Sequence, residues 1–315
     1  MLPGSPTSTG PRGPGAPPIA ITRDSKFLYS NNGYNELLPF QINADGSLTN
    51  APVPSYQAGA VFGLVTHPTA DFLYSTLSIG LEVYAVNSST GALSYTSSVS
   101  LYAQEIPNSA VMTPNGGYLY QGFWTYNSAT TTILQIAGFS VSTATGALSP
   151  VPGSPLSSVS AANVQAVDPT GKFLYVVYEG GVAAYSIDAA SGELTAVPGS
   201  ALGVDGVPNS AAIDASGKFL IVSTSPPPGG APGNCLAVLS IDPSTGTVTP
   251  VPGSPFGPLQ TCVVVAADPS AEYVYAGSSG TVSVLSIDQA TGELALVNQA
   301  TLPGAQEVSF IALTH

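Results

Sequence analysis

The chain has 315 residues, of which only 7% are charged, and 5 Lys and Arg against 18 Asp and Glu give a net charge of −13. A nucleic-acid binder needs a basic stripe to displace counterions, and five scattered cations cannot form one. The same shortage disfavours anionic membranes and phosphorylated ligands. No apolar run reaches the roughly 18 residues that span a bilayer, so no transmembrane segment is predicted and the apolar residues are expected in a sheet core.

The first seventeen residues, MLPGSPTSTGPRGPGAP, are rich in Pro and Gly and are predicted to form an irregular lead-in. Residues 18–315 are expected to form a single domain. The lead-in has no charged segment followed by an apolar one, so the chain shows no export signal.

A short aromatic strand recurs along the chain at intervals of 45 to 55 residues. Turn residues bound it, and two or three further β-branched runs follow each copy with no room for a helix. A period of about 40 to 50 residues with four strands per repeat is typical of a β-propeller blade. The copies are Phe27–Tyr29, Phe72–Tyr74, Tyr118–Tyr120, Phe173–Tyr175, Phe219–Ile221 and Tyr273–Tyr275.

A first strand is predicted just before each of these copies, and a seventh at the end of the chain. Seven first strands and six sets of the other three predict an all-β propeller of seven-bladed design with one blade incomplete. The alternative is a six-bladed ring with a spare terminal strand. The predicted first strands are Ile19–Thr22, Gly63–Thr66, Ser109–Met112, Val164–Val167, Ser210–Ile213, Val264–Ala267 and Phe310–Thr314.

The start of the chain also bears on this count. Leu2–Pro6, LPGSP, matches VPGSP at Val151–Pro155, which follows an outer strand. We therefore expect that the chain is truncated, and that three further strands and an export signal are encoded upstream.

Three motifs carry a resemblance to a known family: DPTGKFLYVV at 168–177, IDQATGEL at 287–294 and VPGSPF at 251–256. They resemble the lactonase family of β-propellers, of the 6-phosphogluconolactonase-like or cycloisomerase 2 type, and especially its low-charge secreted bacterial branch. The resemblance covers residues from about 19 to 314. It implies a propeller fold and a possible lactone substrate, mostly through turn and core positions.

Members of that family usually carry an Arg-His pair at the start of an inner strand, then a His-Pro turn and an Asn-Glu. Every corresponding pair here lacks the Arg-His, while His67-Pro68 and Glu179 remain. The loss removes the cation that would hold an anionic lactone and the proton carrier, which argues against phosphogluconolactone hydrolysis. His67 is predicted to be a turn residue without chemistry.

Asn108, Asn163 and Asn209 occupy the same position of the repeat, immediately before the predicted first strand, which is the inner strand of a blade. On a propeller they would project toward one mouth of the central channel, with Glu105, Asp205 and Glu307 in the connecting loops. Such amides and carboxylates could bind Ca²⁺ or another divalent cation, or hydrogen-bond a polyol. The alternative is a turn in which each Asn bonds its own backbone.

Trp124 and Tyr126 fall in a longer insertion, GFWTYNSATT, between the second and third strands of the third repeat. Loops of that kind emerge at the same face as the three asparagines. The two rings are predicted either to stack on a sugar or peptide or to form a lid that only covers a blade.

Cys235 and Cys262 are expected at the same face on adjacent blades. A disulfide between them would close a loop of roughly 28 residues and stabilise the fold by about 3 kcal/mol. Two buried free thiols are the alternative. A disulfide would place the chain outside a reducing cytosol, in the periplasm or secreted.

The chain has few acid-base and cationic groups, which favours a binding module outside the cytoplasm. Such a module would use its channel mouth and its top face, the face at which the asparagines and the insertions emerge. Its ligand would be a small polyol, a sugar lactone, or a protein or glycan, and the chain is expected to be a monomer. The alternative follows from the resemblance: a hydrolase of neutral sugar lactones, with a metal at the channel mouth or with Glu179, Glu105 or Glu307 as base. A purely structural role is a third hypothesis.

Overall fold

The structure is a computed structural model of the chain. It describes residues 18–32, 35–78, 80–101, 105–127, 131–157, 162–226, 234–257, 261–302, 308 and 310–314, without the side chains of 105–108, 124–127, 131–134 and 162–165. Every regular element in these ranges is a β-strand, which confirms the predicted all-β class. No helix in the described part of the chain is long and apolar enough to span a membrane.

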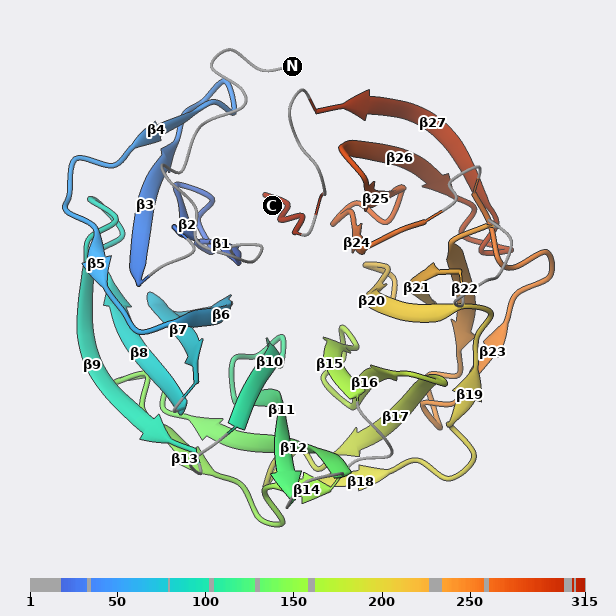
Figure 1. The fold of residues 1–315 in the computed structure, drawn as a ribbon, viewed down its shortest axis with the longest axis horizontal. Helices are drawn as coiled ribbons and strands as arrows, with labels where there is room; N and C mark the ends of the chain where they lie inside the picture. The colour runs from blue at the N-terminus through green and yellow to red at the C-terminus, as the bar shows by residue number, and fades with distance from the viewer. Residues whose placement is uncertain are drawn as a thin grey trace. The chain divides into compact units, whose positions relative to one another are not determined.

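The chain divides into two compact units, residues 1–155 with 314–315 and residues 156–313. In both units the strands form antiparallel sheets in which neighbours follow chain order, the arrangement of propeller blades (Figure 1). The described residues hold six such sheets, three in each unit. The predicted single domain over residues 18–315 stays a prediction.

The first unit contains the first three sheets. Its first sheet is β1 (Ile19–Ile21), β2 (Phe27–Asn31), β3 (Glu36–Ile42) and β4 (Leu48–Asn50), with β5 (Tyr56–Gln57) also paired to β3. The second is β6 (Val61–Thr66), β7 (Phe72–Leu77), β8 (Gly80–Val86) and β9 (Leu93–Ser100). The third is β10 (Glu105–Met112), β11 (Tyr118–Asn127), β12 (Thr131–Val141) and β13 (Leu148–Pro150).

The second unit begins with the short strand β14 (Leu156–Ser157). Its sheets are the fourth to the sixth. The fourth is β15 (Ala162–Val167), β16 (Phe173–Tyr178), β17 (Gly181–Ile187) and β18 (Leu194–Ala196), with β19 (Leu202–Gly203) paired to β17. The fifth is β20 (Val207–Ile213), β21 (Phe219–Ser225), β22 (Leu236–Ile241) and β23 (Val248–Pro250). The sixth is β24 (Val264–Ala267), β25 (Tyr273–Ser278), β26 (Thr281–Ile287) and β27 (Leu294–Thr301).

The recurrent aromatic strand is the second strand of every sheet, and it explains how neighbouring sheets pack. The hydroxyl of Tyr175 donates to the carbonyl oxygen of Gly246, in the third-to-fourth-strand hairpin of the next sheet, at 3.1 Å. Tyr29 makes the same bond to Gly91 at 2.9 Å, and Tyr74 to Gly146 at 3.2 Å. Each ring is buried, so the contact combines apolar burial with a satisfied hydroxyl.

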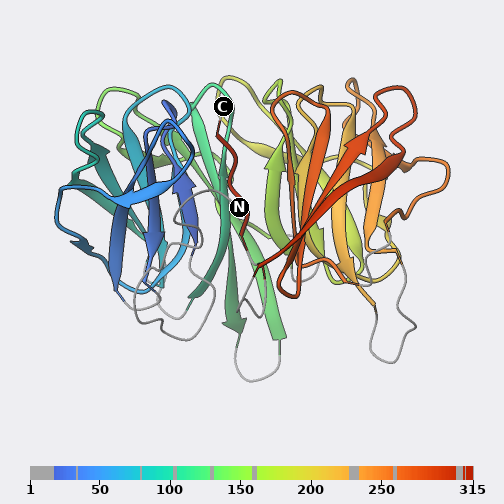
Figure 2. The same ribbon diagram turned by 90° about the horizontal axis from the view of Figure 1, so that it is seen from above.

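Two predicted boundaries differ from the structure. Phe310–Thr314, the predicted seventh first strand, forms no strand, and no described strand pairs with it. An extended segment needs a neighbouring ladder to satisfy its backbone, and the described residues offer none here. The insertion that carries Trp124 and Tyr126 is not an irregular loop: it lengthens β11 and β12 into a hairpin that reaches beyond the other strands of its unit (Figure 2).

The outer strands of the six sheets fall into two kinds. Four of them, β4, β13, β18 and β23, have three residues each. β9 and β27 have eight, and seven of the eight residues of β27 are exposed. β27 contains no charged residue, and Leu296 and Val297 on it are among the exposed large apolar side chains of the described residues.

Candidate functional site

The first strands of four sheets carry a β-bulge near their start. The register shifts between Val61 and Gly63, Pro107 and Ala110, Val164 and Ala166, and Pro208 and Ser210. Asn108 and Asn209 lie inside two of these bulges, and Asn163 pairs with Val177 within β15. The prediction that the asparagines precede the strands is therefore wrong. A bulge adds one residue to a strand and re-aims its side chain, which is why the strand starts earlier than the apolar pattern indicates.

Asn209 is half-buried, and its amide nitrogen is fully used. Nδ2 donates to the hydroxyl of Ser225 at 2.8 Å and to the carbonyl oxygen of Cys262 at 2.7 Å. These bonds run to the second strand of its own sheet and to the sequence before β24, so Asn209 joins the fifth and sixth sheets. These two hydrogen bonds of Nδ2 are neither the predicted turn bond to the residue's own backbone nor contacts to a metal. The side chains of Asn108 and Asn163 lie outside the described residues.

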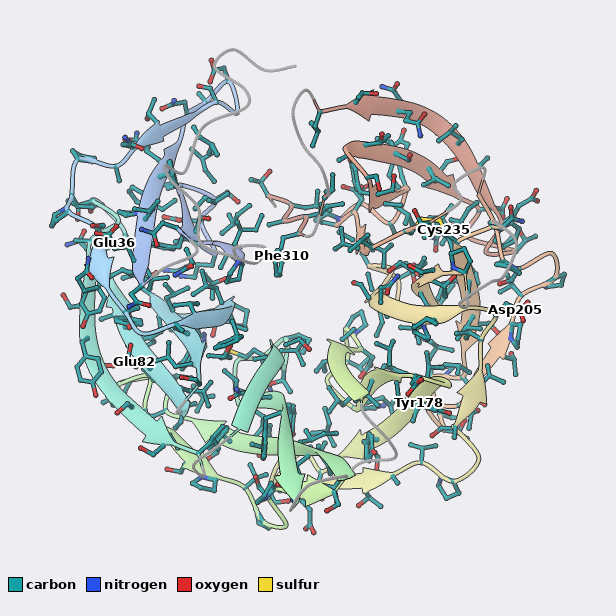
Figure 3. All side chains as sticks on the ribbon, viewed as in Figure 1. Glu36, Glu82, Tyr178, Asp205, Cys235 and Phe310 are labelled. Carbon is teal, nitrogen blue, oxygen red and sulfur yellow. A yellow bond between two sulfur atoms is a disulfide. The ribbon has the colours of Figure 1, made fainter. Side chains whose placement is uncertain are left out.

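The two cysteines lie next to this contact. The structure joins Cys235, just before β22, to Cys262, just before β24, by a disulfide, which is the pairing favoured by the sequence (Figure 3 labels Cys235). Both cysteines are buried. The backbone of Thr224 bridges them: its N–H donates to the Cys235 carbonyl at 2.8 Å, and its carbonyl accepts from the Cys262 N–H at 3.2 Å.

The end of a sheet at which its first strand begins and its second strand ends is here called the amide end, after the asparagines. In the third sheet the amide end is formed by the lengthened hairpin. Glu105 pairs with Thr125, and Ile106 pairs with Trp124, so the backbone brings Glu105 and Asn108 beside the strand that bears Trp124 and Tyr126. Four of the predicted site residues thus share the end of one sheet.

The remaining predicted carboxylates lie in the second unit. Glu179 is exposed in the turn between β16 and β17, directly after Tyr178, which pairs with Ala162 next to Asn163. Asp205 is exposed between β19 and β20, two residues before Val207 (Figure 3 labels Tyr178 and Asp205). Glu179 and Asp205 therefore lie at the amide ends of the fourth and fifth sheets. Glu307 lies outside the described residues.

Two other carboxylates of the first unit have structural partners. Glu36 accepts hydrogen bonds from Gln57 and Asn32, both at 2.7 Å, and from Ser55 at 3.0 Å. Glu82 accepts from the hydroxyl of buried Tyr84, and burial followed by this bond raises the pKa of Tyr84 (Figure 3 labels Glu36 and Glu82). Glu36 thus joins β3 to β5, whereas the bond between Glu82 and Tyr84 lies within one strand, β8.

A metal site of acidic or imidazole ligands is not formed by the side chains that the structure describes, where no three His, Cys, Asp or Glu gather. Asp188, Asp242 and Asp288 each accept backbone N–H groups two and three residues ahead, which are Asx turns. Hydrogen bonds hold the pKa of each carboxyl below its usual range, first that of the Ser244 hydroxyl for Asp242 and first these backbone bonds for Asp188 and Asp288. The predicted amide ligands are not tested by this observation.

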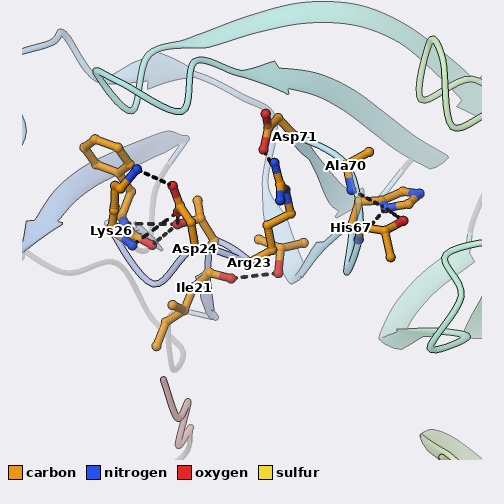
Figure 4. Close-up of polar contacts among 11 residues, drawn as sticks. Ile21, Arg23, Asp24, Lys26, His67, Ala70 and Asp71 are labelled. Carbon is orange, nitrogen blue, oxygen red and sulfur yellow. Dashed lines mark hydrogen bonds and ion pairs between the residues drawn. The ribbon is translucent and has the colours of Figure 1, made fainter. Parts of the chain in front are cut away.

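His67 is a turn cap. It is buried, and its Nδ1 accepts the backbone N–H groups of Ala70 at 3.0 Å and Thr69 at 3.1 Å (Figure 4). Because Nδ1 accepts, the ring proton of the neutral form lies on Nε2. Asp168 and Asp214 cap the equivalent turns with carboxylates. His67 is thus a turn residue, as predicted.

Two cations of the first unit are paired with carboxylates. Arg23 Nε contacts Asp71 at 2.9 Å, and Lys26 Nζ contacts Asp24 at 3.1 Å (Figure 4). Both pairs are exposed, so they contribute little to stability. The chain has only five Lys and Arg residues, and these pairs occupy two of them. Those two cations are therefore less available to an anionic ligand.

Sequence reasoning missed Ser225 and the bulges. Ser225 ends β21 and receives one of the two Asn209 bonds. The sequence does contain a signal, Pro-Asn-Ser at 208–210, which interrupts the alternation of apolar and polar residues along the strand. A turn and a bulge both produce this local pattern, so the sequence does not distinguish them.

Comparisons with known proteins agree with this architecture. Residues 119–222 match the sequence profile of the family described as "Lactonase, 7-bladed beta-propeller". None of the curated proteins is significantly similar to the chain in sequence.

Solved structures show the same fold at low identity. The periplasmic gluconolactonase PpgL of Pseudomonas aeruginosa is 15% identical with a TM-score of 0.71, over 92% of this chain and 86% of that one. A candidate 6-phosphogluconolactonase of Bacteroides uniformis is 17% identical with a TM-score of 0.73, over 92% and 85%. A second, from Bacteroides fragilis, is 18% identical with a TM-score of 0.70, over 92% and 84%.

Proposed function

We propose that this chain, whose residues 119–222 match the family of seven-bladed lactonase β-propellers, is an extracytoplasmic module that binds a small neutral carbohydrate at its amide end. The observation that carries the proposal is the register of the third sheet. It sets the strand of Glu105 and Asn108 against the strand of Trp124 and Tyr126, in a hairpin longer than the others of its unit.

The residue types in that hairpin suit a polyol or a sugar lactone. Indole and phenol rings present large apolar faces to the C–H groups of a sugar, while an amide and a carboxylate accept and donate hydrogen bonds to its hydroxyls. The ligand is neutral in this proposal because Arg23 and Lys26 are already paired with Asp71 and Asp24.

The extracytoplasmic location is part of the proposal. The Cys235–Cys262 disulfide supports it, because structural disulfides persist in oxidising compartments. The similarity in fold to a periplasmic gluconolactonase points the same way. Intact-mass measurement of alkylated protein from the native host tests it: alkylation of both cysteines without reductant would contradict it.

Trp124 is the only tryptophan of the chain, so its fluorescence reports directly on the proposed site. Titration with neutral sugars and aldono-1,5-lactones is expected to give a saturable change in emission. Calorimetry on Trp124→Ala is expected to show at least about a fivefold loss of affinity, since stacking on an aromatic ring is worth about 1 kcal/mol or more.

The matched control is Tyr95→Ser, which removes an exposed aromatic ring from the outer strand β9, away from the amide end. This variant is expected to bind as the wild type does. No saturable signal with any neutral sugar, or equal loss in both variants, would contradict the proposed site.

A second candidate function is hydrolysis of neutral sugar lactones. The observation that favours it is the exposed carboxylate of Glu179, at the amide end of the fourth sheet and beside the strand of Asn163. An exposed carboxylate can act as a general base that takes a proton from the attacking water. The periplasmic gluconolactonase of similar fold makes lactones the first substrates to try.

A pH-stat assay with a neutral aldono-1,5-lactone separates the two functions. If the chain is a hydrolase, turnover exceeds the spontaneous rate and falls at least a hundredfold in Glu179→Gln, the range expected when a general base is removed. Glu193→Gln, an exposed carboxylate of the Asp188 hairpin, is the control and keeps its rate. A rate equal to background leaves only the binding function.

Thermal unfolding tests for a bound metal. If Asn163 and Asn209 of the second unit hold Ca²⁺ or another divalent cation, EDTA lowers the midpoint of thermal unfolding and added Ca²⁺ restores it. A midpoint that EDTA does not move argues against a metal at the amide end.

A further inference from the structure

Gln121, in the middle of β11, has no hydrogen-bond partner for either side-chain polar atom. Its Nε2 and Oε1 are both buried and unpaired, and the residue is 0% exposed. Leaving a carboxamide desolvated and unpaired is costly, and few such groups occur in folded proteins. A partner small enough to enter a closed interior would remove this cost.

The backbone shows which interface Gln121 faces. Side chains alternate along a strand, so Gln121 shares its face with Leu119 and Phe123. Those two pack against Tyr74, Leu81 and Val83 of the second sheet. Gln121 therefore points into the interface between the second and third sheets of the first unit.

Small side chains flank Gln121 on the neighbouring strands. Its paired neighbours are Ala110 on β10 and Ala137 on β12, whose side chains are single methyl groups. Long side chains would otherwise fill the space on both sides of the carboxamide.

A second buried polar group faces the same interface. Thr76 shares its face of β7 with Tyr74, which packs toward the third sheet, and Thr76 is 0% exposed. Its hydroxyl makes only a long bond of 3.5 Å, to the carbonyl oxygen of Gly63. The hydroxyl oxygen can still accept a hydrogen bond.

The second unit has apolar residues where Gln121 stands. The residue after the recurrent aromatic strand is Val176 in the fourth sheet, Val222 in the fifth and Ala276 in the sixth, all buried. The fold thus accepts an aliphatic side chain at this position. A buried carboxamide here is not needed for folding of a blade.

We propose that Gln121 and Thr76 form an internal hydration site that holds ordered water between the second and third sheets. Water both donates and accepts, so it can take the Nε2 hydrogens and supply a hydrogen to Oε1 while it contacts the Thr76 hydroxyl. Buried waters in proteins typically make about three such bonds to groups that have no other partner. The ligand class is water, because the surrounding side chains are uncharged.

The thermodynamic test is a double-mutant cycle on the whole chain with Gln121→Leu, Thr76→Val and the double variant. If water bridges the two side chains, each single variant unfolds at a lower denaturant concentration. The double variant then loses less than the sum of the two, because the first substitution already removes the shared water. Val222→Leu, at the equivalent apolar position, controls for the change in packing.

Two outcomes of the cycle overturn the proposal. One is a higher unfolding midpoint for Gln121→Leu, which is the result expected when an unpaired polar group is removed from an interior. The other is strict additivity of the two single variants.

A crystal structure of the wild-type chain tests the site directly, whatever the variants do. The expected result is an ordered water within about 3 Å of Nε2 or Oε1 of Gln121 and of the Thr76 hydroxyl. Clear density for the two side chains without water between them would overturn the proposal even if the variants fail to fold.

Discussion

His67 shows how one residue type can make a shared turn sensitive to pH. Its imidazole replaces the carboxylate that caps the equivalent turns through Asp168 and Asp214. Burial lowers the pKa of His67 below its usual value, and the nearby cation Arg23 acts in the same direction. The folded chain therefore resists protonation of this ring.

The pH dependence of stability follows from this shift. Below the ordinary histidine pKa of about 6.5 the unfolded chain takes up a proton that the folded chain does not, so unfolding becomes easier as the pH falls. Above that pKa the ring is neutral in both the folded and the unfolded chain, so His67 causes no further change of the unfolding free energy with pH. We predict that His67→Asp, which keeps a cap, loses less stability than the wild type between pH 7 and pH 5.

Urea unfolding of both proteins at several pH values measures this difference, and all other titrating groups cancel in the comparison. A difference in unfolding free energy that does not change between pH 7 and pH 5 would show that His67 titrates alike in the folded and unfolded chains.

At the scale of elements, four of the described hairpins between a third and a fourth strand place a glycine against the aromatic strand of the preceding sheet, namely Gly91, Gly146, Gly246 and Gly292. Gly246 has a φ of 75°, and a Cβ there would lie 2.4 Å from Cδ1 of Phe173. The hairpin thus needs glycine for two reasons: its backbone lies in the left-handed region, and its neighbour lies too close for a side chain.

Gly199 separates these two reasons. Its φ is 72°, but a Cβ there would meet nothing within 4 Å. We predict that Gly199→Ala costs about 1 kcal/mol of unfolding free energy, the strain of the backbone alone. Gly246→Ala is expected to cost at least about 1 kcal/mol more, because the strand of Phe173 must shift.

Chemical denaturation of the two variants gives both values. Equal losses would mean that the sheets adjust to the added methyl group without cost.

The elements also show what sequence patterns reveal and what they hide. The aromatic strands were predictable because Phe and Tyr at 173 and 175 and their equivalents recur between turn residues. The bulge at Asn209 was not, because a bulge is defined by the partner strand and not by the bulged sequence. Trp124 was predicted in a loop because the Thr-rich segment that follows masks the alternation of β12.

At the scale of the whole molecule, the period in the sequence predicts the four-stranded sheets, but not the site chemistry. The contact of Asn209 with Cys262 joins residues 53 positions apart, and no local pattern signals it. The disulfide could be predicted from the sequence because two cysteines allow only one pairing.

The disulfide leads to a prediction for the fifth and sixth sheets. Its two cysteines are 27 positions apart, and a cross-link of this span restricts the unfolded chain by about 3 kcal/mol. The double variant Cys235→Ala/Cys262→Ala is expected to lose stability of that order. It is also expected to weaken the bonds of Asn209, whose acceptor is the Cys262 carbonyl.

Thermal unfolding of the double variant, compared with the wild type without reductant, measures the loss. An unchanged midpoint would show that the packing of the two sheets restricts these residues without the cross-link.

The long outer strand β27 has a consequence for handling the protein. An exposed strand edge is a template for pairing with another chain, and natural sheets usually guard it with a lysine or a proline of its own. β27 has neither, so we expect repulsion to come from the net charge of −13 carried by the whole chain. Salt screens that repulsion, so the protein should keep best in dilute buffer and self-associate as ionic strength rises.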